Sequence, residues 1–200
     1  MNLFIDRYVC LLPEGVRPEM ADVMTGDDLL CALYKTLKCS YPKFYKMDGM
    51  CRLGFIAAEL LLGSPRPDAE KDSGTAMVVF SQMGSYANDM RYQETIANDA
   101  DFYPSPAIFV YTLPNIVTGE IAIRHGITGE TSAYIVSPDS FKEAYELVCQ
   151  TFTDKSVKRV LAMWCDYKSA SAFRCVAAVI STTPDKTRFD IETIKNICDE

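Results

Sequence analysis

The chain has 200 residues, of which 48% are hydrophobic and 24% are charged, an ordinary balance for a globular protein. Its formal net charge of −7 would repel a phosphate backbone, so we expect no nucleic-acid partner. The N-terminal residues carry charges where a signal peptide needs an apolar run. The longest apolar stretch is about ten residues, against roughly 20 for a membrane span. We therefore expect one cytoplasmic domain over 1–200 without membrane contact.

The chain contains eight cysteines and a single histidine, His125. None of the cysteines forms a Cys-x-x-Cys pair, so the ligand spacing of a zinc site is absent, and we expect neither a metal nor a cofactor. Several of the cysteines lie inside apolar periodic segments, where cysteine behaves as a small hydrophobic residue. Free thiols in a reducing compartment are the better interpretation.

The first part of the chain predicts a strand, a helix and a second strand. Residues 3–12 alternate loosely between apolar and polar, which indicates a strand, and a long connection with one short helix near 28–37 follows. Apolar residues at helical spacing predict a helix over 47–62 that ends at Gly63. After a loop, the continuous apolar run 75–81 is typical of a buried parallel strand.

The middle of the chain predicts further alternation. Residues 85–98 indicate a polar helix, and a second helix is expected over 112–125, capped by its first threonine and ended by Gly126. Residues 131–136 predict a strand, and 138–152 predict the helix that follows it.

The last part predicts two strands, 157–166 and 172–181, joined by a tight turn, and a final helix over 188–198. Strands that alternate with helices favour an α/β fold with a mostly parallel sheet covered on both faces. The last two strands are so close in sequence that they must be antiparallel. We therefore predict a five-stranded mixed sheet whose last strand is antiparallel, with helices on both faces.

Short motifs at the centre of the chain indicate a family. Lys46–Leu53 leads into an alanine-containing helix, and Gly74–Phe80 forms a strand. Further on stand a Ser-Pro pair, a Pro-Asn pair, a glycine four residues later, an Ile-Ala pair and a closing Gly-x-x-Gly. In this order the motifs resemble those of β-ketoacyl synthases, over roughly residues 40–182. The positions that carry the resemblance are Pro114, Asn115, Gly119, Gly126 and Gly129.

The resemblance implies a half-unit of the thiolase-like fold, and the predicted order of elements agrees with it. Gly119 also has a physical interpretation. A glycine inside a helix costs about 1 kcal/mol relative to alanine, so we expect close backbone packing at this position. The alternative is a tolerated surface glycine.

The residues that make this family catalytic are missing. Active members carry a cysteine where the strand here at 131–136 turns into the next helix, and the helix N-terminus stabilises its thiolate. The nearest cysteine, Cys149, lies about three turns into that helix, too far to gain from its N-terminus. The family's two catalytic histidines belong to a second half-domain, and His125 falls in the wrong place for that role. The turn itself reads Ser137, Pro138, Asp139 and Ser140.

This degenerate turn has a structural interpretation. Ser137 as the cap, Pro138 at the first helical position and Asp139 in the first turn form a strong helix start. The alternative is that Ser137 or Ser140 acts as a nucleophile, which needs a nearby general base that the sequence does not offer.

The helix predicted at 138–152 is amphipathic. In a complete synthase the corresponding helix lies between the two halves, and such a helix should be apolar all round. Here one face is polar, and burying it unpaired would be costly. We therefore expect that face to meet solvent or a polar partner. The polar face consists of Lys142, Glu143, Glu146 and Gln150, and the apolar face of Phe141, Ala144, Tyr145, Val148 and Phe152.

The resemblance leads to a first hypothesis: a non-catalytic ketosynthase-like accessory protein of fatty-acid or polyketide-type synthesis. It would form a homodimer or a heterodimer with a catalytic ketosynthase. The family dimerises along the strand before the nucleophile, which places the interface at Thr131, Ala133 and Ile135. That strand has high β-propensity and no charge, so a free edge there would tend to pair.

Two other functions remain open. The chain could retain activity as a thioester hydrolase or decarboxylase through Ser137 or Ser140, which would make it an acyltransferase-like enzyme. It could instead be a module that binds an acyl chain or an acyl carrier protein. Because such carriers are acidic, the net charge of −7 opposes docking unless Lys155, Lys158 and Arg159 form a local basic patch.

Overall fold

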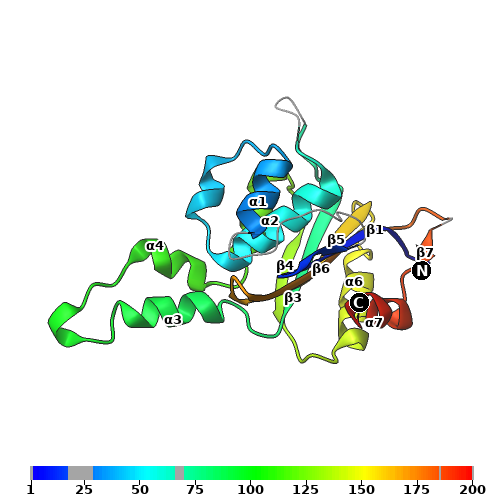
Figure 1. The fold of residues 1–200 in the computed structure, drawn as a ribbon. Helices are drawn as coiled ribbons and strands as arrows, with labels where there is room; N and C mark the ends of the chain where they lie inside the picture. The colour runs from blue at the N-terminus through cyan, green and yellow to red at the C-terminus, as the bar shows by residue number, and fades with distance from the viewer. Residues whose placement is uncertain (1, 18–28, 66–69, 185, 200) are drawn as a thin grey trace.

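The computed structural model describes residues 2–17, 29–65, 70–184 and 186–199 and arranges them as one mixed sheet between two helical layers (Figure 1). The predicted start of the first helix at residue 28 and positions 66–69 of the predicted loop lie outside the described residues.

Within the described part of the chain, the sheet has seven strands. Five of them are long: β1 (Phe4–Leu12), β3 (Thr75–Ser81), β4 (Thr131–Ile135), β5 (Arg159–Ser169) and β6 (Ala172–Ser181). The short strands β2 (Gly15–Arg17) and β7 (Thr187–Arg188) both pair with β1. The spatial order is β2-β1-β6-β5-β3-β4, with β7 beside β1.

The strand directions agree with the predicted class. β3 pairs in parallel with β4 and with β5, β6 is antiparallel to β5, and β1 is antiparallel to β6. Four of the five long strands therefore run in one direction, and the last runs against them. The predicted count of five was too low, because two- and three-residue strands leave no periodic pattern in a sequence.

Helices cover both faces of the sheet. One face carries α1 (Leu29–Thr36), α2 (Gly49–Leu62) and α5 (Ile116–His125), and the other carries α6 (Phe141–Thr151) and α7 (Ile191–Asp199). The remaining helices, α3 (Tyr86–Glu94) and α4 (Pro106–Phe109), lie in a projection that leaves the body of the molecule (Figure 1). Short 3-10 turns occur at Pro42–Lys46, Asp99–Asp101 and Val110–Thr112.

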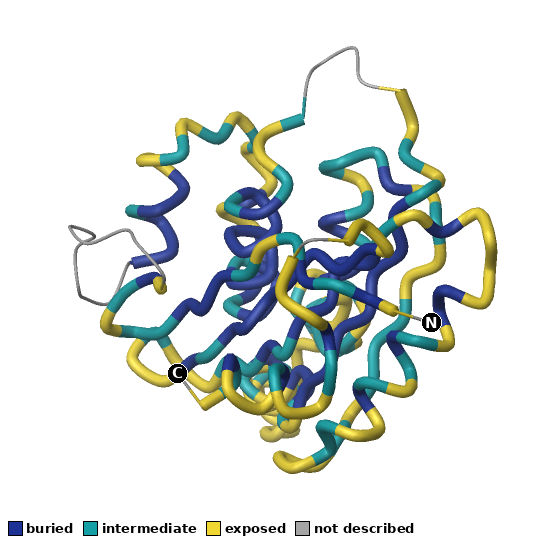
Figure 2. Tube along the Cα trace, turned by 90° about the vertical axis from the view of Figure 1, so that its right-hand side faces the viewer, coloured by how far each residue is buried: buried dark blue, intermediate teal, exposed yellow. Residues whose placement is uncertain are grey.

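The sheet divides the hydrophobic core into two clusters, one under each helical layer. Figure 2 shows that the buried residues concentrate in the strands and in the helices beside them. Every residue of β3 is buried, as the continuous apolar run predicted. Its alternate side chains serve the two clusters: Met77 and Val79 pack with α2, and Val78 and Phe80 pack on the side of α6. β3 therefore contributes to both halves of the core.

Three predicted helix starts were wrong: the last helix, predicted from residue 188, begins at Ile191, and the other two were placed at a proline. The helix predicted from residue 112 begins at Ile116, after Asn115, and the Thr112 hydroxyl donates to the Phe109 carbonyl (2.7 Å) at the end of a separate 3-10 turn. The helix predicted from residue 138 begins at Phe141. In both places a proline had suggested the first helical turn, but the proline lies in a tight turn before the helix.

The amphipathic character of α6 is confirmed. Ala144, Val148 and Phe152 are buried against the sheet, whereas the four polar residues of the opposite face are exposed. Lys142 and Glu146 form an exposed i,i+4 pair at 3.9 Å. The helix packs against α7 and leaves its polar face outside.

No helix among the described residues is by itself long and apolar enough to cross a membrane; a pair bent by 96°, Pro106–Thr112 with Ile116–His125, passes by length and composition only. None of the eight cysteines forms a disulfide bond.

Two glycines of the family motif have opposite environments. A Cβ at Gly129 would lie 2.2 Å from the Thr75 carbonyl oxygen, so only glycine allows this loop to approach β3. A Cβ at Gly119 would meet nothing within 4 Å. The prediction of close packing at Gly119 was therefore wrong: its helix position faces open space.

These environments predict opposite effects of alanine. Gly129→Ala should lower the free energy of unfolding by about 2–3 kcal/mol, because the backbone of β3 must move to admit a methyl group. Gly119→Ala should raise it by about 0.5–1 kcal/mol through helix propensity alone. Urea denaturation of both variants measures the difference, and destabilisation by Gly119→Ala would contradict the open environment.

Candidate functional site

The carboxyl ends of β3, β4 and β5 lie at one edge of the sheet because these strands are parallel. Each strand delivers polar residues to that edge. β3 ends at Ser81, and β4 leads into the turn at 137–140. β5 carries Asp166, two residues after Trp164, the last residue of β5 that pairs with β3. Ligand sites of open α/β sheets form at such an edge.

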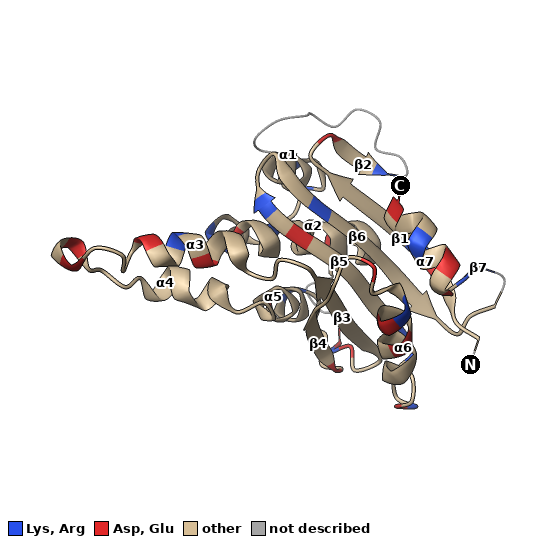
Figure 3. Cartoon of the chain, turned by 90° about the horizontal axis from the view of Figure 1, so that it is seen from below, with Lys and Arg blue, Asp and Glu red and all other residues tan. Residues whose placement is uncertain are grey.

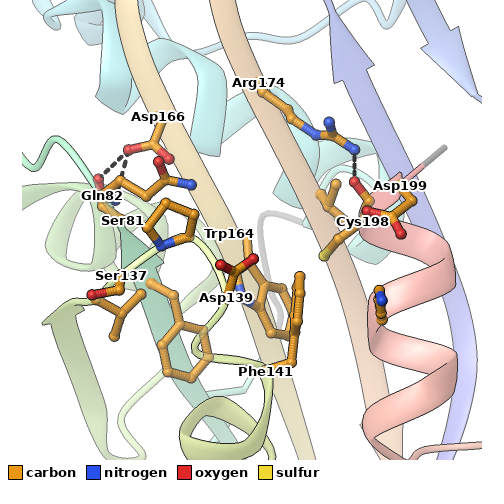
Figure 4. A pocket seen from close by; sticks show the side chains of 15 residues that line it. Ser81, Gln82, Ser137, Asp139, Phe141, Trp164, Asp166, Arg174, Cys198 and Asp199 are labelled. Carbon is orange, nitrogen blue, oxygen red and sulfur yellow. Dashed lines mark hydrogen bonds between the residues drawn. The ribbon is translucent and has the colours of Figure 1, made fainter.

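A cavity of about 250 Å³ opens there, between the turn and α7 (Figure 4). Its apolar lining includes Phe80 and Trp164, whose ring centroids are 5.0 Å apart. Charged groups of both signs surround this lining: Asp139, Asp166, Arg174, Lys195 and Asp199. The site is small and mixed in polarity, whereas drug-sized ligands usually occupy about 300–1,000 Å³.

The turn at 137–140 does not form the helix cap that the sequence predicted. The Ser140 amide donates to the Ser137 carbonyl (3.1 Å), which closes a turn before the helix begins. Ser140 occupies the cap position, and no side-chain hydrogen bond caps the helix. Ser137 therefore lies outside the helix and is exposed on the rim of the cavity.

The serine nucleophile hypothesis gains no support from the geometry. Among the hydrogen bonds of the described residues, none involves the hydroxyl of Ser137 or Ser140. His125 ends α5, which covers the opposite face of the sheet from the cavity. An activated serine needs a base within hydrogen-bond reach.

Two of the charged groups at the cavity, Asp166 and Arg174, have structural roles. Asp166 Oδ1 accepts hydrogen bonds from the Ser81 hydroxyl (2.7 Å) and from the amides of Gln82 and Met83 (both 2.9 Å). The Arg174 guanidinium donates to the Cys198 carbonyl and so holds the end of α7 (Figure 4). The sequence pattern did not single out either group, since each partner is distant in the chain.

The cavity also contains a thiol that the sequence analysis did not consider. Burial raises the pKa of Cys198 to about 12, so this thiol stays protonated at neutral pH. Because the thiolate is the reactive form, Cys198 is a poor nucleophile. Cys149 lies on α6 and packs with the apolar cluster, away from the helix N-terminus, as predicted.

His125 belongs to a buried ionic cluster between α2 and α5. Arg124 Nε lies 2.7 Å and His125 Nε2 lies 3.3 Å from Glu59 Oε1. Burial acts to raise the pKa of Glu59, but the adjacent His125 and hydrogen bonds from Arg124, Ser64 and Cys39 outweigh it and hold the pKa well below its usual range. The histidine thus belongs to this cluster and has no access to the cavity.

Glu59→Gln should lower the free energy of unfolding at pH 7 by about 3 kcal/mol, because it leaves buried positive charge without its partner. The folded pKa is depressed, so the carboxylate stabilises the fold above the unfolded pKa of about 4.3 and loses this effect as the pH falls below it. The difference in the free energy of unfolding between the wild type and the variant should therefore become smaller below about pH 4. Thermal unfolding as a function of pH measures this difference.

Glu146→Gln is the matched control, since that carboxylate is 62% exposed and its lysine partner is 3.9 Å away. Its stability should equal that of the wild type at every pH. An equal loss in both variants would contradict the buried cluster as the source of the effect.

The predicted interface strand is an edge strand. β4 pairs only with β3 among the described strands, and its sequence carries no charged residue. Thr131 and Ile135 are exposed, and Ala133 is half-buried. An uncharged strand with free backbone groups is prone to pair with another chain.

The predicted carrier-docking residues lie at the other end of the sheet. Lys155 and Lys158 are exposed just before β5 begins. Arg159 forms an ion pair with Asp72 (2.8 Å) and donates to the Thr75 hydroxyl (2.6 Å). Of the three residues, only Lys155 and Lys158 are therefore free of an ion pair with the rest of the described chain. They lie at the amino end of β5, whereas the cavity lies at its carboxyl end.

Comparison with known proteins shows which fold this arrangement belongs to. No protein-family model and no curated protein matches the sequence. Solved structures do match: the ishigamide ketosynthase/chain length factor superposes with a TM-score of 0.70 and 17% identity, over 94% of this chain and 64% of that chain. This chain has the thiolase-like fold of ketosynthases.

Two further structures agree. The ketosynthase (ApeO) in complex with its chain length factor (ApeC) from Xenorhabdus doucetiae gives a TM-score of 0.62 and 15% identity, over 92% of this chain and 80% of that chain. AntDE:AntF, a type II PKS acyl-carrier protein in complex with its ketosynthase bound to the hexaketide, gives 0.66 and 11%, over 90% and 62%. The chain spans less than two thirds of the ishigamide and AntDE:AntF chains.

Proposed function

We propose that this chain is a non-catalytic ketosynthase-like subunit of fatty-acid or polyketide-type synthesis, located in the cytoplasm. It acts by pairing with a catalytic ketosynthase or with a second copy of itself. The observation that carries the proposal is the combination of a ketosynthase fold with an uncharged, open β4 edge and a turn without a thiol.

The matched structures support this assignment by their composition. Two of them are described as a ketosynthase together with a chain length factor, and the third as a ketosynthase with an acyl-carrier protein. In this chain two of the charged groups at the cavity, Asp166 and Arg174, bind neighbouring elements, and burial keeps the thiol of Cys198 protonated. A subunit that contributes a binding surface but no catalytic group agrees with the matched complexes and with the state of the cavity.

Pairing along β4 predicts a specific loss. Ile135→Lys places a charge on the open edge, where strand addition would desolvate it. The variant should bind the purified ketosynthase of the source organism, or itself, at least tenfold more weakly, as measured by sedimentation velocity. Ile191→Lys, on α7 and 41% exposed, is the control and should bind as the wild type does. A wild-type chain that stays monomeric with every such ketosynthase would refute the proposal.

The absence of acyl chemistry is tested separately. Incubation with acyl-carrier and acyl-coenzyme A thioesters should leave the intact mass unchanged and release no free acid. A stable adduct that disappears in Ser137→Ala or Ser140→Ala would instead establish a thioester hydrolase or decarboxylase. Binding of a carrier protein that Lys155→Glu and Lys158→Glu abolish would support the third function, a carrier-docking module.

A further inference from the structure

The floor of the cavity is apolar and is formed largely by the sheet. Phe80 and Trp164 are register partners on β3 and β5, with 5.0 Å between their ring centroids. Val176 of β6 is the partner of Trp164 on its other side, and Phe141 of α6 adds a third ring. A floor of this kind accepts an apolar or aromatic group.

The rim of the cavity carries charges of both signs. Figure 4 shows an acidic side chain of the turn on one side of the cavity and charged side chains of β6 and α7 on the other. Acidic and basic residues occur together along α7, as Figure 3 shows. The rim groups are Asp139 on the turn, Arg174 on β6, and Lys195 and Asp199 on α7. With Asp166, the lining has a net charge of −1, so neither a simple anion nor a simple cation matches all of it.

Several of these charged groups are not used by the fold. Among the described residues, the side chains of Asp139, Lys195 and Asp199 form no hydrogen bond and no ion pair. Arg174 donates to the Cys198 carbonyl, but this bond uses only one of the five N–H donors of a guanidinium. Asp166, by contrast, is occupied by three donors. The cavity therefore offers both cationic donors and a carboxylate to a ligand.

The volume of the cavity limits the size of this ligand. About 250 Å³ corresponds to about eight water molecules at about 30 Å³ each. A free amino acid with an apolar side chain is of this size, whereas a nucleotide or a coenzyme is much larger. Such an amino acid is also a zwitterion with an apolar body, which is the chemistry that the rim and the floor together present.

We propose that this cavity binds a free amino acid with an aromatic or branched apolar side chain. The side chain packs on Phe80 and Trp164, Arg174 and Lys195 donate to the α-carboxylate, and the α-ammonium group donates to Asp139. The face of the Trp164 indole adds a cation–π contact to the ammonium group. Asp199, beside the basic pair, disfavours a second carboxylate, so aspartate and glutamate are poor ligands. The inference does not rest on the proposed function, because it requires neither pairing nor thioester chemistry.

The sequence supplies its own probe of this site. Trp164 is the only tryptophan of the chain and lines the cavity, so its fluorescence reports occupancy directly. Titration of the full-length protein with L-phenylalanine or L-leucine should change the tryptophan emission saturably, with a Kd at or below about 1 mM. The absence of a saturable change with either amino acid would overturn the inference.

Two analogues of phenylalanine test the two charges of the ligand separately. 3-Phenylpropanoate lacks the ammonium group, and 2-phenylethylamine lacks the carboxylate. Each should bind at least tenfold more weakly than L-phenylalanine, because one side of the rim is then left without its partner. Equal affinity of either analogue and the amino acid would overturn recognition of a zwitterion.

Two nearly isosteric variants assign the charges to residues. Asp139→Asn should raise the Kd for L-phenylalanine at least tenfold and leave that for 3-phenylpropanoate unchanged or lower, because only the amino acid uses the carboxylate. Lys195→Gln should weaken both ligands. Both positions are exposed, so the fold should be unaffected. The matched controls, Asp101→Asn and Lys142→Gln, are exposed residues outside the cavity and should change each Kd by less than twofold. An unchanged Kd in Asp139→Asn would place the ligand elsewhere and overturn the site.

A competing ligand separates this inference from acyl chemistry. An acyl thioester supplies an apolar chain but no ammonium group for the turn. If a short acyl thioester of N-acetylcysteamine displaces L-phenylalanine and binds at least tenfold more tightly, the cavity is an acyl site and the inference is overturned. Pairing of the chain along β4 is measured independently by sedimentation, so the proposed function can stand when this inference fails, and the reverse.

Discussion

The fold depends on the hydrogen bonding of β3 between two parallel neighbours. Because β4 and β5 pair with opposite edges of this fully buried strand, the carboxyl ends of the three strands lie side by side. The candidate site lies at this edge of the sheet. The degenerate turn, the origin of the projection that contains α3 and α4, and Asp166 are brought together there. The same pairing leaves β4 outermost, with one edge free. A slip of β3 by one residue would exchange its two packing faces and remove all of these features together.

Two polar groups of the site at this edge hold neighbouring elements together. Asp166 satisfies three donors at the start of the projection, and Arg174 binds the last turn of α7. A carboxylate that accepts three hydrogen bonds and a guanidinium that holds a carbonyl are poorly placed to exchange protons with a substrate. The cavity therefore lies where residues 82–83, the turn at 137–140 and α7 meet, and its hydrogen-bonded charges hold these elements to the sheet.

Much of this fold could be predicted from the sequence, because long periodic segments determine their own structure. The strand at 75–81 follows from its continuous apolar run, and the two faces of α6 follow from the helical spacing of its apolar residues. The helix starts near Pro114 and Pro138 could not be predicted, because a proline fits a tight turn as well as a first helical turn. The role of Asp166 could not be predicted either, since its partners are about 85 positions away in the chain. Gly119 shows the same limit: a motif position does not reveal what surrounds it.

The hydrogen bond between Ser85 and the Thr112 carbonyl has an evolutionary consequence. It joins two positions near the base of the projection that contains α3 and α4, with 2.5 Å between the Ser85 hydroxyl and the Thr112 carbonyl oxygen, so the 26 positions between them form a closed insertion. A short loop could span the same two positions without disturbing the hydrogen bonds of the sheet. The length and sequence of this insertion can therefore change while the sheet stays the same.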